Sequence, residues 1–324
     1  MKIKWFVLVF LLVILPISSI ASAHVPRTAE GNHSLETAMF IEDPIKSWAI
    51  YSELGNGQIA NYYKMDLDEG DRLYLSIITP EDQDFIPNMV IIGPGIQDMD
   101  TIPNFINRPE NHGAKLVPGV PGEREYEPFT PGSYYHPTRF DRRLSDSGTY
   151  YVVVYNPEEI GGKYALAVGY RESWTPLEWV RLPIDVVNIR IWEGQSLPLI
   201  FSPLIFTIAL GSIWVKKELG IPDDIKEWSL VTSGLLYMGT GAMMVMQILI
   251  SSLQSNPGAL VIVTIFFAFV PLFMGYKILI KSKEELDRET RSKLVLYGFL
   301  GLLFWAGLII GPVIVLFTGL ALRK

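Results

Sequence analysis

The sequence predicts an exported β-sandwich of antiparallel strands followed by a transmembrane bundle of four α-helices. Three observations predict this order: a split in charge along the chain, long uncharged stretches in its second half, and short alternating strands in its first half. Of the 324 residues, 49% are hydrophobic and 19% are charged, against about 25% charged in ordinary soluble domains. The chain has no cysteine, which excludes disulfide bonds and cysteine-ligated metal sites.

The charge split indicates one half in water and one half in lipid. Residues 24–194 hold 26 acidic and 14 basic side chains, whereas residues 195–324 hold 8 acidic and 11 basic ones. An acidic domain joined to an apolar, slightly basic one is typical of a membrane protein with a large aqueous domain. Because nucleic-acid phosphates need a basic surface, we expect no nucleic-acid partner.

The amino terminus has the pattern of a secretory signal. Lys2 and Lys4 precede an uncharged run that ends in the small residues Ala21-Ser22-Ala23. This pattern predicts a signal peptide over residues 1–23, cleaved before His24. The alternative is an uncleaved anchor, because the run is about long enough to cross a bilayer. In both cases the chain from His24 onward is expected outside the cell.

The second half contains three uncharged stretches, residues 194–215, 228–276 and 294–322. The middle stretch is too long for one helix and contains a polar turn at 251–258. The sequence therefore predicts a multi-pass domain over residues 197–324, surrounded by the lipid bilayer. Its four spans are expected at about 197–215, 229–251, 258–280 and 294–321.

The basic loops set the expected orientation in the cell membrane. Loops 216–227 and 281–293 carry clusters of lysine and arginine, so the positive-inside rule places them in the cytoplasm. Residues 24–194 are then extracellular, in agreement with the signal. The uncharged stretches hold no Asp, Glu, Lys, Arg or His, whereas ion-coupled transporters normally place such groups within their spans.

Residues 173–196 are expected to join the two domains along the membrane surface. Leu177, Val180, Ile184, Val187 and Ile191 recur at three- and four-residue steps, which favours an interfacial helix. A proline at position 183 leaves a strand over 186–192 as the alternative.

Residues 24–172 alternate between apolar and polar side chains over short segments. Segments 61–67 and 72–78 alternate on either side of a Gly-Asp turn, and residues 89–92 form a short apolar strand. Segments 149–155 and 162–170 are expected to pair as a late hairpin. Short alternating strands with such turns are typical of an antiparallel sandwich.

These strands carry a family resemblance. Residues 61–73, with the turn Gly70-Asp71, resemble the first strand pair of bacterial pre-peptidase C-terminal domains. Residues 147–154 and 162–168 resemble the closing hairpin of the same family. The resemblance covers about residues 34–170 and implies a small jelly-roll-like sandwich, which is often accessory to secreted enzymes and in some cases implicated in substrate binding. It implies no catalytic residues.

Residues 146–151 also resemble strand F of immunoglobulin domains, in which a tyrosine makes a corner hydrogen bond. The cysteine that follows in those domains is missing here. An immunoglobulin-like sandwich is therefore the second interpretation of the fold.

Residues 93–148 form a predicted long loop with eight prolines between the central strands and the closing hairpin. Aromatic rings beside arginines can hold a glycan, an anionic ligand or a partner surface. The alternative is a stiff flap packed on the sandwich. The candidate ligand or partner residues in this loop are Tyr134, Tyr135, His136, Arg139, Arg142 and Arg143.

Two weaker site hypotheses concern the start of the exported chain. Once exposed by cleavage, the amine and imidazole of His24 could chelate copper with a second histidine such as His33, because copper favours nitrogen ligands. The triplet Asn32-His33-Ser34 is a glycosylation sequon. The sequence has no hydrolase or phosphate-loop motif, so no catalytic residue and no cofactor are assigned.

The leading functional hypothesis is a non-catalytic multi-pass membrane protein. Its extracellular sandwich would recognise a ligand, the cell envelope or a partner membrane protein. The first alternative is a component of a transporter or channel. The second alternative is a copper-binding protein with an N-terminal histidine.

Overall fold

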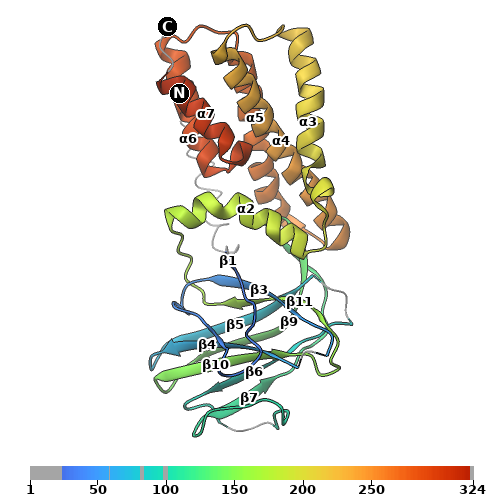
Figure 1. Cartoon of the computed structure of the whole chain (residues 1–324), viewed down its shortest axis with the longest axis vertical. Helices are drawn as coiled ribbons and strands as arrows, with labels where there is room; N and C mark the ends of the chain where they lie inside the picture. The colour runs from blue at the N-terminus through green and yellow to red at the C-terminus, as the bar shows by residue number, and fades with distance from the viewer. Residues whose placement is uncertain (1–23, 58, 81–83, 98–100, 322–324) are drawn as a thin grey trace. The chain divides into compact units, whose positions relative to one another are not determined.

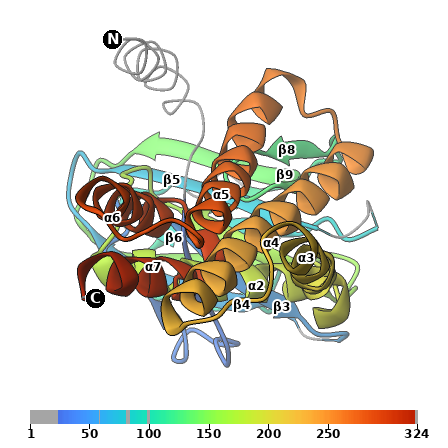
Figure 2. The same cartoon turned by 90° about the horizontal axis from the view of Figure 1, so that it is seen from above.

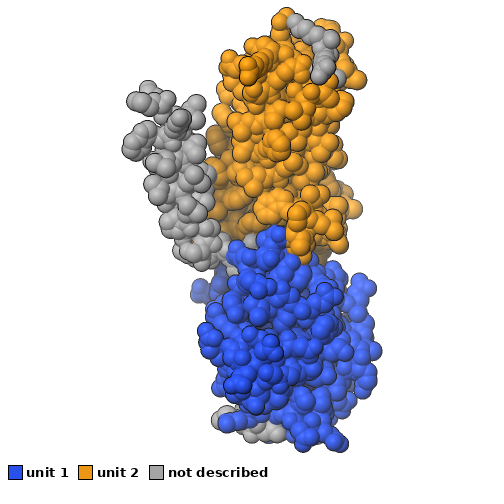
Figure 3. Space-filling view, turned by 90° about the vertical axis from the view of Figure 1, so that its left-hand side faces the viewer, with its two compact units in different colours: residues 1–127, 133–174 blue, residues 128–132, 175–324 orange. Residues whose placement is uncertain are grey.

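The computed structural model describes residues 24–57, 59–80, 84–97 and 101–321. The predicted signal peptide, residues 1–23, lies outside the described residues. The chain divides into two compact units, coloured separately in Figure 3. The β unit comprises residues 24–127 and 133–174, and the helical unit comprises residues 128–132 and 175–321.

The β unit consists of two sheets (Figure 1). The first has the order β1-β3-β11-β5-β9-β8 and the second the order β2-β4-β10-β6-β7. The strands are β1 Val25–Thr28, β2 Met39–Phe40, β3 Trp48–Leu54, β4 Asn61–Leu67, β5 Arg72–Thr79, β6 Asn88–Gly93, β7 Gly113–Val117, β8 Glu125–Glu127, β9 Gly132–Arg143, β10 Gly148–Tyr155 and β11 Gly162–Val168. Most registered neighbours are antiparallel, but β1 runs parallel to β3 and β2 to β4, so both sheets are mixed.

The predicted strand positions are confirmed, but the predicted hairpin is wrong. Strand β10 pairs with β4 and β6 in the second sheet, whereas β11 pairs with β3 and β5 in the first. Consecutive strands thus cross between sheets. This arrangement lets the apolar faces of both sheets bury each other, which a flat hairpin would not.

The core between the sheets takes one alternate face of each strand. Met65, Leu75, Val152 and Leu166 are fully buried in it. A second cluster covers the opposite face of the second sheet, where Ile106 from the loop before β7 packs with Val90 and Ile92. Burial on both faces explains why β6 is a continuous apolar run rather than an alternating one.

Three tyrosines and an asparagine form hydrogen bonds inside the sandwich. The hydroxyls of Tyr63 and Tyr164 lie 2.7 Å apart, and the side-chain amide of Asn61 donates to the Tyr164 hydroxyl at 2.8 Å. The hydroxyl of Tyr150 donates to the carbonyls of Asp146 at 2.7 Å and Pro94 at 2.9 Å. The bond from the Tyr150 hydroxyl to the carbonyl four residues upstream matches the tyrosine corner hydrogen bond of immunoglobulin-like domains.

Residues 93–148 are not the long loop that the sequence predicted. They contain β7, β8 and the 12-residue β9, which pairs with β5 from Arg72 to Thr79. The prolines fall mainly between these strands, and Pro137 lies within β9. The alternating Tyr134, Thr138 and Phe140 are buried, so this segment completes the sheet rather than leaving it.

The helical unit contains α2 Pro176–Trp192, α3 Leu197–Glu218, α4 Ile225–Gln254, η1 Gly258–Leu260, α5 Val261–Lys281, α6 Arg288–Leu303, η2 Ala306–Leu308 and α7 Ile310–Leu320. Three helical segments are long and apolar enough to cross a membrane: Leu197–Glu218, Ile225–Gln254 and Gly258–Lys281. Helix α4 packs against α3, α5 and α7 (Figure 2).

The fourth predicted span is wrong, because the chain breaks between α6 and α7. Trp305, Leu308 and Ile309 have positive φ angles, and so does Gly307. The ring of Tyr237, from α4, fills the break: a Cβ at Gly307 would lie 3.1 Å from it. The chain turns around this buried ring instead of continuing as one helix.

Helix α2 confirms the predicted helix in the segment before the spans, and the alternative strand over 186–192 is wrong. Thr175 and Glu178 form a reciprocal capping box at its start, and Pro183 is accommodated inside the helix. Leu177 and Ile184 are exposed, at 75% and 63% of their surface. Within the helical unit, α2 thus has an uncovered apolar side.

Candidate ligand-binding pocket

The two candidate copper ligands, His24 and His33, each contact a different polar side chain. Nδ1 of His24 is 2.6 Å from the Ser47 hydroxyl, and Nδ1 of His33 is 2.9 Å from the side-chain oxygen of Asn61. Burial, with a smaller effect of His136, lowers the pKa of His24 from 6.5 to about 4. Among the described residues, no group of three His, Asp or Glu side chains has the geometry to hold a metal ion. The copper hypothesis therefore stays a prediction about the mature terminus.

The residues predicted to form a ligand loop lie along β9. Tyr135 stacks under the guanidinium of Arg124 at 4.6 Å, and Nε2 of His136 is 3.9 Å from Glu125. Tyr134 is buried in the sheet. By contrast, the side chains at positions 139, 142 and 143 are exposed, namely Arg139, Arg142 and Arg143. The strand therefore spreads these six side chains over buried and exposed positions instead of converging them on one cavity.

The predicted glycosylation site does not fit the folded β unit. Asn32 is only 1% exposed, and its side-chain nitrogen donates to the carbonyl of Tyr62 at 2.9 Å. A glycan on that nitrogen needs solvent. Asn32 is thus a buried residue whose side chain makes a structural hydrogen bond in this fold.

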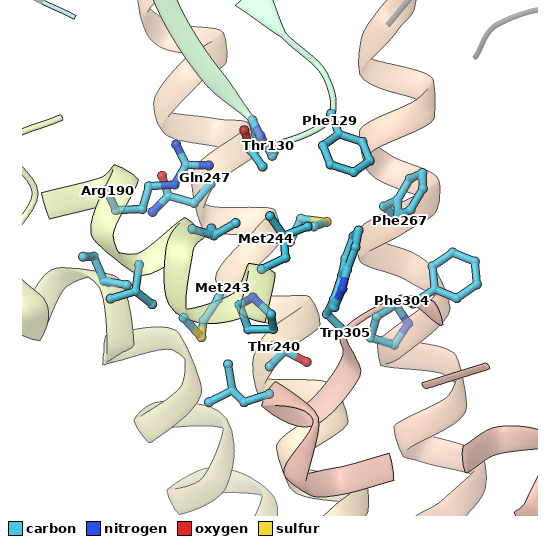
Figure 4. A pocket seen from close by; sticks show the side chains of 18 residues that line it. Phe129, Thr130, Arg190, Thr240, Met243, Met244, Gln247, Phe267, Phe304 and Trp305 are labelled. Atoms are coloured by element: carbon cyan, nitrogen blue, oxygen red, sulfur yellow. The ribbon is translucent and has the colours of Figure 1, made fainter. Parts of the chain in front are cut away.

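An apolar pocket lies within the helical unit (Figure 4). Its volume is about 120 Å³. Six parts of the unit contribute walls: the segment 128–132, helices α2, α3, α4 and α5, and the break between α6 and α7. The lining residues are Phe129, Thr130, Pro131, Leu182, Pro183, Val186, Val187, Arg190, Ile200, Thr240, Met243, Met244, Gln247, Phe267, Pro271, Phe304, Trp305 and Leu308.

One side of the pocket is polar. Nη1 of Arg190 donates to both carboxylate oxygens of Glu193 at 2.8 Å. The side-chain amides of Gln195 and Gln247 donate to each other at 2.9 and 2.8 Å, and Gln195 also donates to Glu193. Figure 4 shows Arg190 and Gln247 side by side here. The positive and negative charges cancel, so this side offers hydrogen bonds without net charge.

The other side is aromatic. The ring of Phe129 meets Phe267 edge-on at 6.3 Å and Trp305 at 5.7 Å, and Phe267 also contacts Phe304. These rings face Met243 and Met244 across the pocket in Figure 4. Such rings contribute large apolar area with little conformational freedom to lose on binding.

Two sets of hydrogen bonds fix the aromatic side. The buried hydroxyl of Thr264 donates to the carbonyl of Pro128 at 2.9 Å, which holds the segment bearing Phe129. The indole of Trp305 donates to the carbonyl of Trp179 at 2.9 Å, and the two indoles lie 4.3 Å apart. The wall of the pocket is therefore preformed rather than built by a ligand.

The helix break supplies part of the same wall. The backbone N–H of Gly307 donates to the hydroxyl of Thr240 at 2.9 Å, and Phe304, Trp305 and Leu308 line the pocket. Irregular backbone within a membrane is tolerated where protein covers it or where it lines a cavity. The strained residues of the break meet this condition.

The sequence interpretation did not predict this pocket. Gln247 and Thr240 were visible as polar residues within uncharged stretches, and such residues most often join helices. Segment 128–132 lies more than a hundred residues before the α5 residues that it meets. The polar residues just before the predicted span at 197, Arg190, Glu193 and Gln195, are the sequence signal for the polar side of the pocket.

Comparison with known proteins gave likenesses among solved structures only. No family model matches the chain, and no curated protein matches it. Among solved structures, the chain is similar to the pre-peptidase C-terminal domain of a collagenase from Bacillus anthracis. The two are 17% identical, with a TM-score of 0.25, and the match covers 40% of this chain and 93% of that domain. This match is to the same family that the sequence resembles, and it concerns the fold alone.

Proposed function

We propose that this chain is a non-catalytic membrane protein that binds a small apolar ligand in the pocket of its helical unit. The β unit lies outside the cell in this proposal, where it recognises a ligand, the envelope or a partner subunit. Loops 216–227 and 281–293 face the cytoplasm, and residues 1–23 are a signal peptide. The basic loops and the three apolar helices support this orientation.

One observation carries the binding function: an apolar pocket with a polar side whose groups pair with one another. Gln195 and Gln247 pair together, and Arg190 pairs with Glu193. Paired groups of this kind can orient a ligand by exchanging hydrogen bonds with it. A preformed apolar wall with a few convergent polar groups is the usual form of a small-molecule site.

The test uses the full chain in lipid nanodiscs and a small phenyl diazirine as a photoreactive probe. We expect saturable labelling of Met243, Met244 and Phe304, which line the pocket. M244W fills the cavity and is expected to abolish the saturable part. L249W is the matched control, since Leu249 lies on the same helix and is 61% exposed. Labelling that rises linearly with the probe and is unchanged in M244W would exclude the site.

A second function, as a component of a transporter or channel, is favoured by one specific feature. The break around Gly307 lines the pocket, and in secondary transporters discontinuous helices form the substrate site at mid-membrane. Reconstitution in liposomes distinguishes the two functions. An absence of solute flux, both alone and with co-purifying subunits, removes the transport function and leaves binding.

The recognition role of the β unit has its own test. Affinity purification of the full chain from native membranes should retain a partner or an envelope component. A matched purification of the variant R139A/R142A/R143A shows whether the exposed arginines of β9 take part. Recovery of the chain alone, under conditions that preserve known membrane complexes, would contradict this role.

A further inference from the structure

We propose that the pocket of the helical unit holds a single hydrocarbon chain of an amphiphile whose polar head is uncharged or zwitterionic. The head lies at the side of Arg190 and Gln247, and the chain lies among the rings and methionines. This inference rests on the proposed binding function and names the ligand class of that site.

The cavity matches a narrow apolar group in size. Its volume is about 120 Å³, and an engineered protein cavity of about 150 Å³ holds one benzene molecule. The volume therefore matches a benzene-sized ring or a section of one hydrocarbon chain.

The chemistry of the wall favours a flexible chain over a rigid ring. Met243 and Met244 face the aromatic side, and unbranched thioether side chains adapt to ligands of variable shape. Helices long and apolar enough to cross a membrane form part of the cavity wall. In a bilayer, lipid hydrocarbon chains surround such helices. A hydrocarbon chain is thus the most abundant apolar group that can enter this pocket.

The polar side decides the charge of the head group. The guanidinium of Arg190 is 3% exposed and already has both oxygens of Glu193 as acceptors. The carboxylate of Glu193 already balances this charge, so an anionic head would place a second negative charge beside it. Hydroxyl or ester groups need only exchange hydrogen bonds with the Gln195–Gln247 pair, at little cost.

The experiment measures competition for the photolabelled pocket in the full chain. A monoacylglycerol with a mid-chain diazirine is added to nanodiscs, and the labelled residues are identified by mass spectrometry. We expect saturable labelling at Met243 or Met244, reduced about tenfold in M244W and less than about twofold in L249W. Unlabelled monoacylglycerol should compete better than the fatty-acid anion of equal chain length.

A polar-side variant tests the placement of the head. Q247L removes one partner of the amide pair, so it should weaken competition by monoacylglycerol while leaving competition by a plain alkane of equal length unchanged. An equal loss for both competitors would show that the head does not lie at Gln247. The retained alkane competition also shows that the variant is folded.

The competing lipids identify the source of the chain. Competition by phosphatidylcholine together with monoacylglycerol indicates a bilayer lipid, and competition by monoacylglycerol alone indicates a free amphiphile; both support the inference. If the phenyl diazirine labels the pocket but no chain competes, the inference is overturned and the binding function stands. If neither probe labels the pocket saturably, both are overturned. Stronger competition by the fatty-acid anion overturns the uncharged or zwitterionic head.

Discussion

The break in the last predicted span depends on close contact between a glycine and a buried tyrosine, and a single methyl group should disturb it. A Cβ at Gly301 would lie 1.9 Å from the hydroxyl oxygen of Tyr237, 2.5 Å from its Cζ and 2.8 Å from Pro312. The Tyr237 side chain is fully buried, and its hydroxyl donates to the carbonyl of Tyr297 at 3.0 Å. G301A therefore requires the ring to shift and weakens its hydrogen bond.

The magnitude follows from three opposing effects. Overpacking a buried site costs about 1–3 kcal/mol, and a lost hydrogen bond costs about 1 kcal/mol. Replacing glycine by alanine within a helix returns about 1 kcal/mol. We expect G301A to lower the free energy of unfolding by about 2 kcal/mol, and Y237F alone by about 1 kcal/mol.

A double-mutant cycle isolates the contact. Y237F removes the atom closest to the new methyl group, so in its background G301A should cost about 1 kcal/mol less than in the wild type. The measurement is unfolding in mixed detergent micelles, followed by circular dichroism. G298A is the control, because its Cβ meets Leu316 and not Tyr237, so its effect should add to that of Y237F. If G301A and Y237F also add within about 0.5 kcal/mol, Tyr237 does not fill the break.

Three further predictions concern other parts of the chain. The pKa of His24 in the folded chain is about 4, below its ordinary value of 6.5. On acidification the His24 ring therefore takes up its proton in the unfolded chain before it does so in the folded chain. The free energy of unfolding should fall by up to ~3 kcal/mol as the pH drops through this window. Unfolding midpoints of H24Q should fall less over that window, and equal slopes would contradict burial of a neutral ring. T264V should lower the midpoint by removing the bond to Pro128, at about 1 kcal/mol, whereas T264S should not; equal midpoints for both variants would refute this role. K283M removes the lysine that lies 2.6 Å from Glu227, whose side chain is 12% exposed. This loss should lower the free energy of unfolding by about 2 kcal/mol. Thermal melts should show K283M/E227Q to be more stable than K283M, and the opposite order would count against the ion pair.

The strands and the long helices were predictable because their signals are local. Alternation over residues 61–67 and 162–168 puts every second side chain on one face, and this pattern needs no knowledge of the partner strand. The uncharged stretches likewise set three spans by length alone. The charge split separates the acidic half from the apolar half for the same reason, because a count of charges along the chain does not depend on which residues meet.

The assignment of strands to sheets was not predictable in the same way. Strands β10 and β11 follow each other closely and have the lengths of a hairpin, yet each pairs in a different sheet. Segment 93–148 was predicted as a loop because of its eight prolines, but seven of them lie outside β9 and only Pro137 lies within it. Pairing is decided by which apolar faces meet across the core, and that is a contact between residues far apart in the chain.

The composition and the order of residues determined by themselves that this chain has an acidic β-rich half and an apolar half with spans. Only the tertiary structure decided that the last span breaks and that a pocket forms beside the break. The physical reason is that the break packs around Tyr237 from another helix, which a Cβ at Gly301 or Gly307 would meet. The pocket collects its walls from six separate segments, and no pattern along the chain records their meeting.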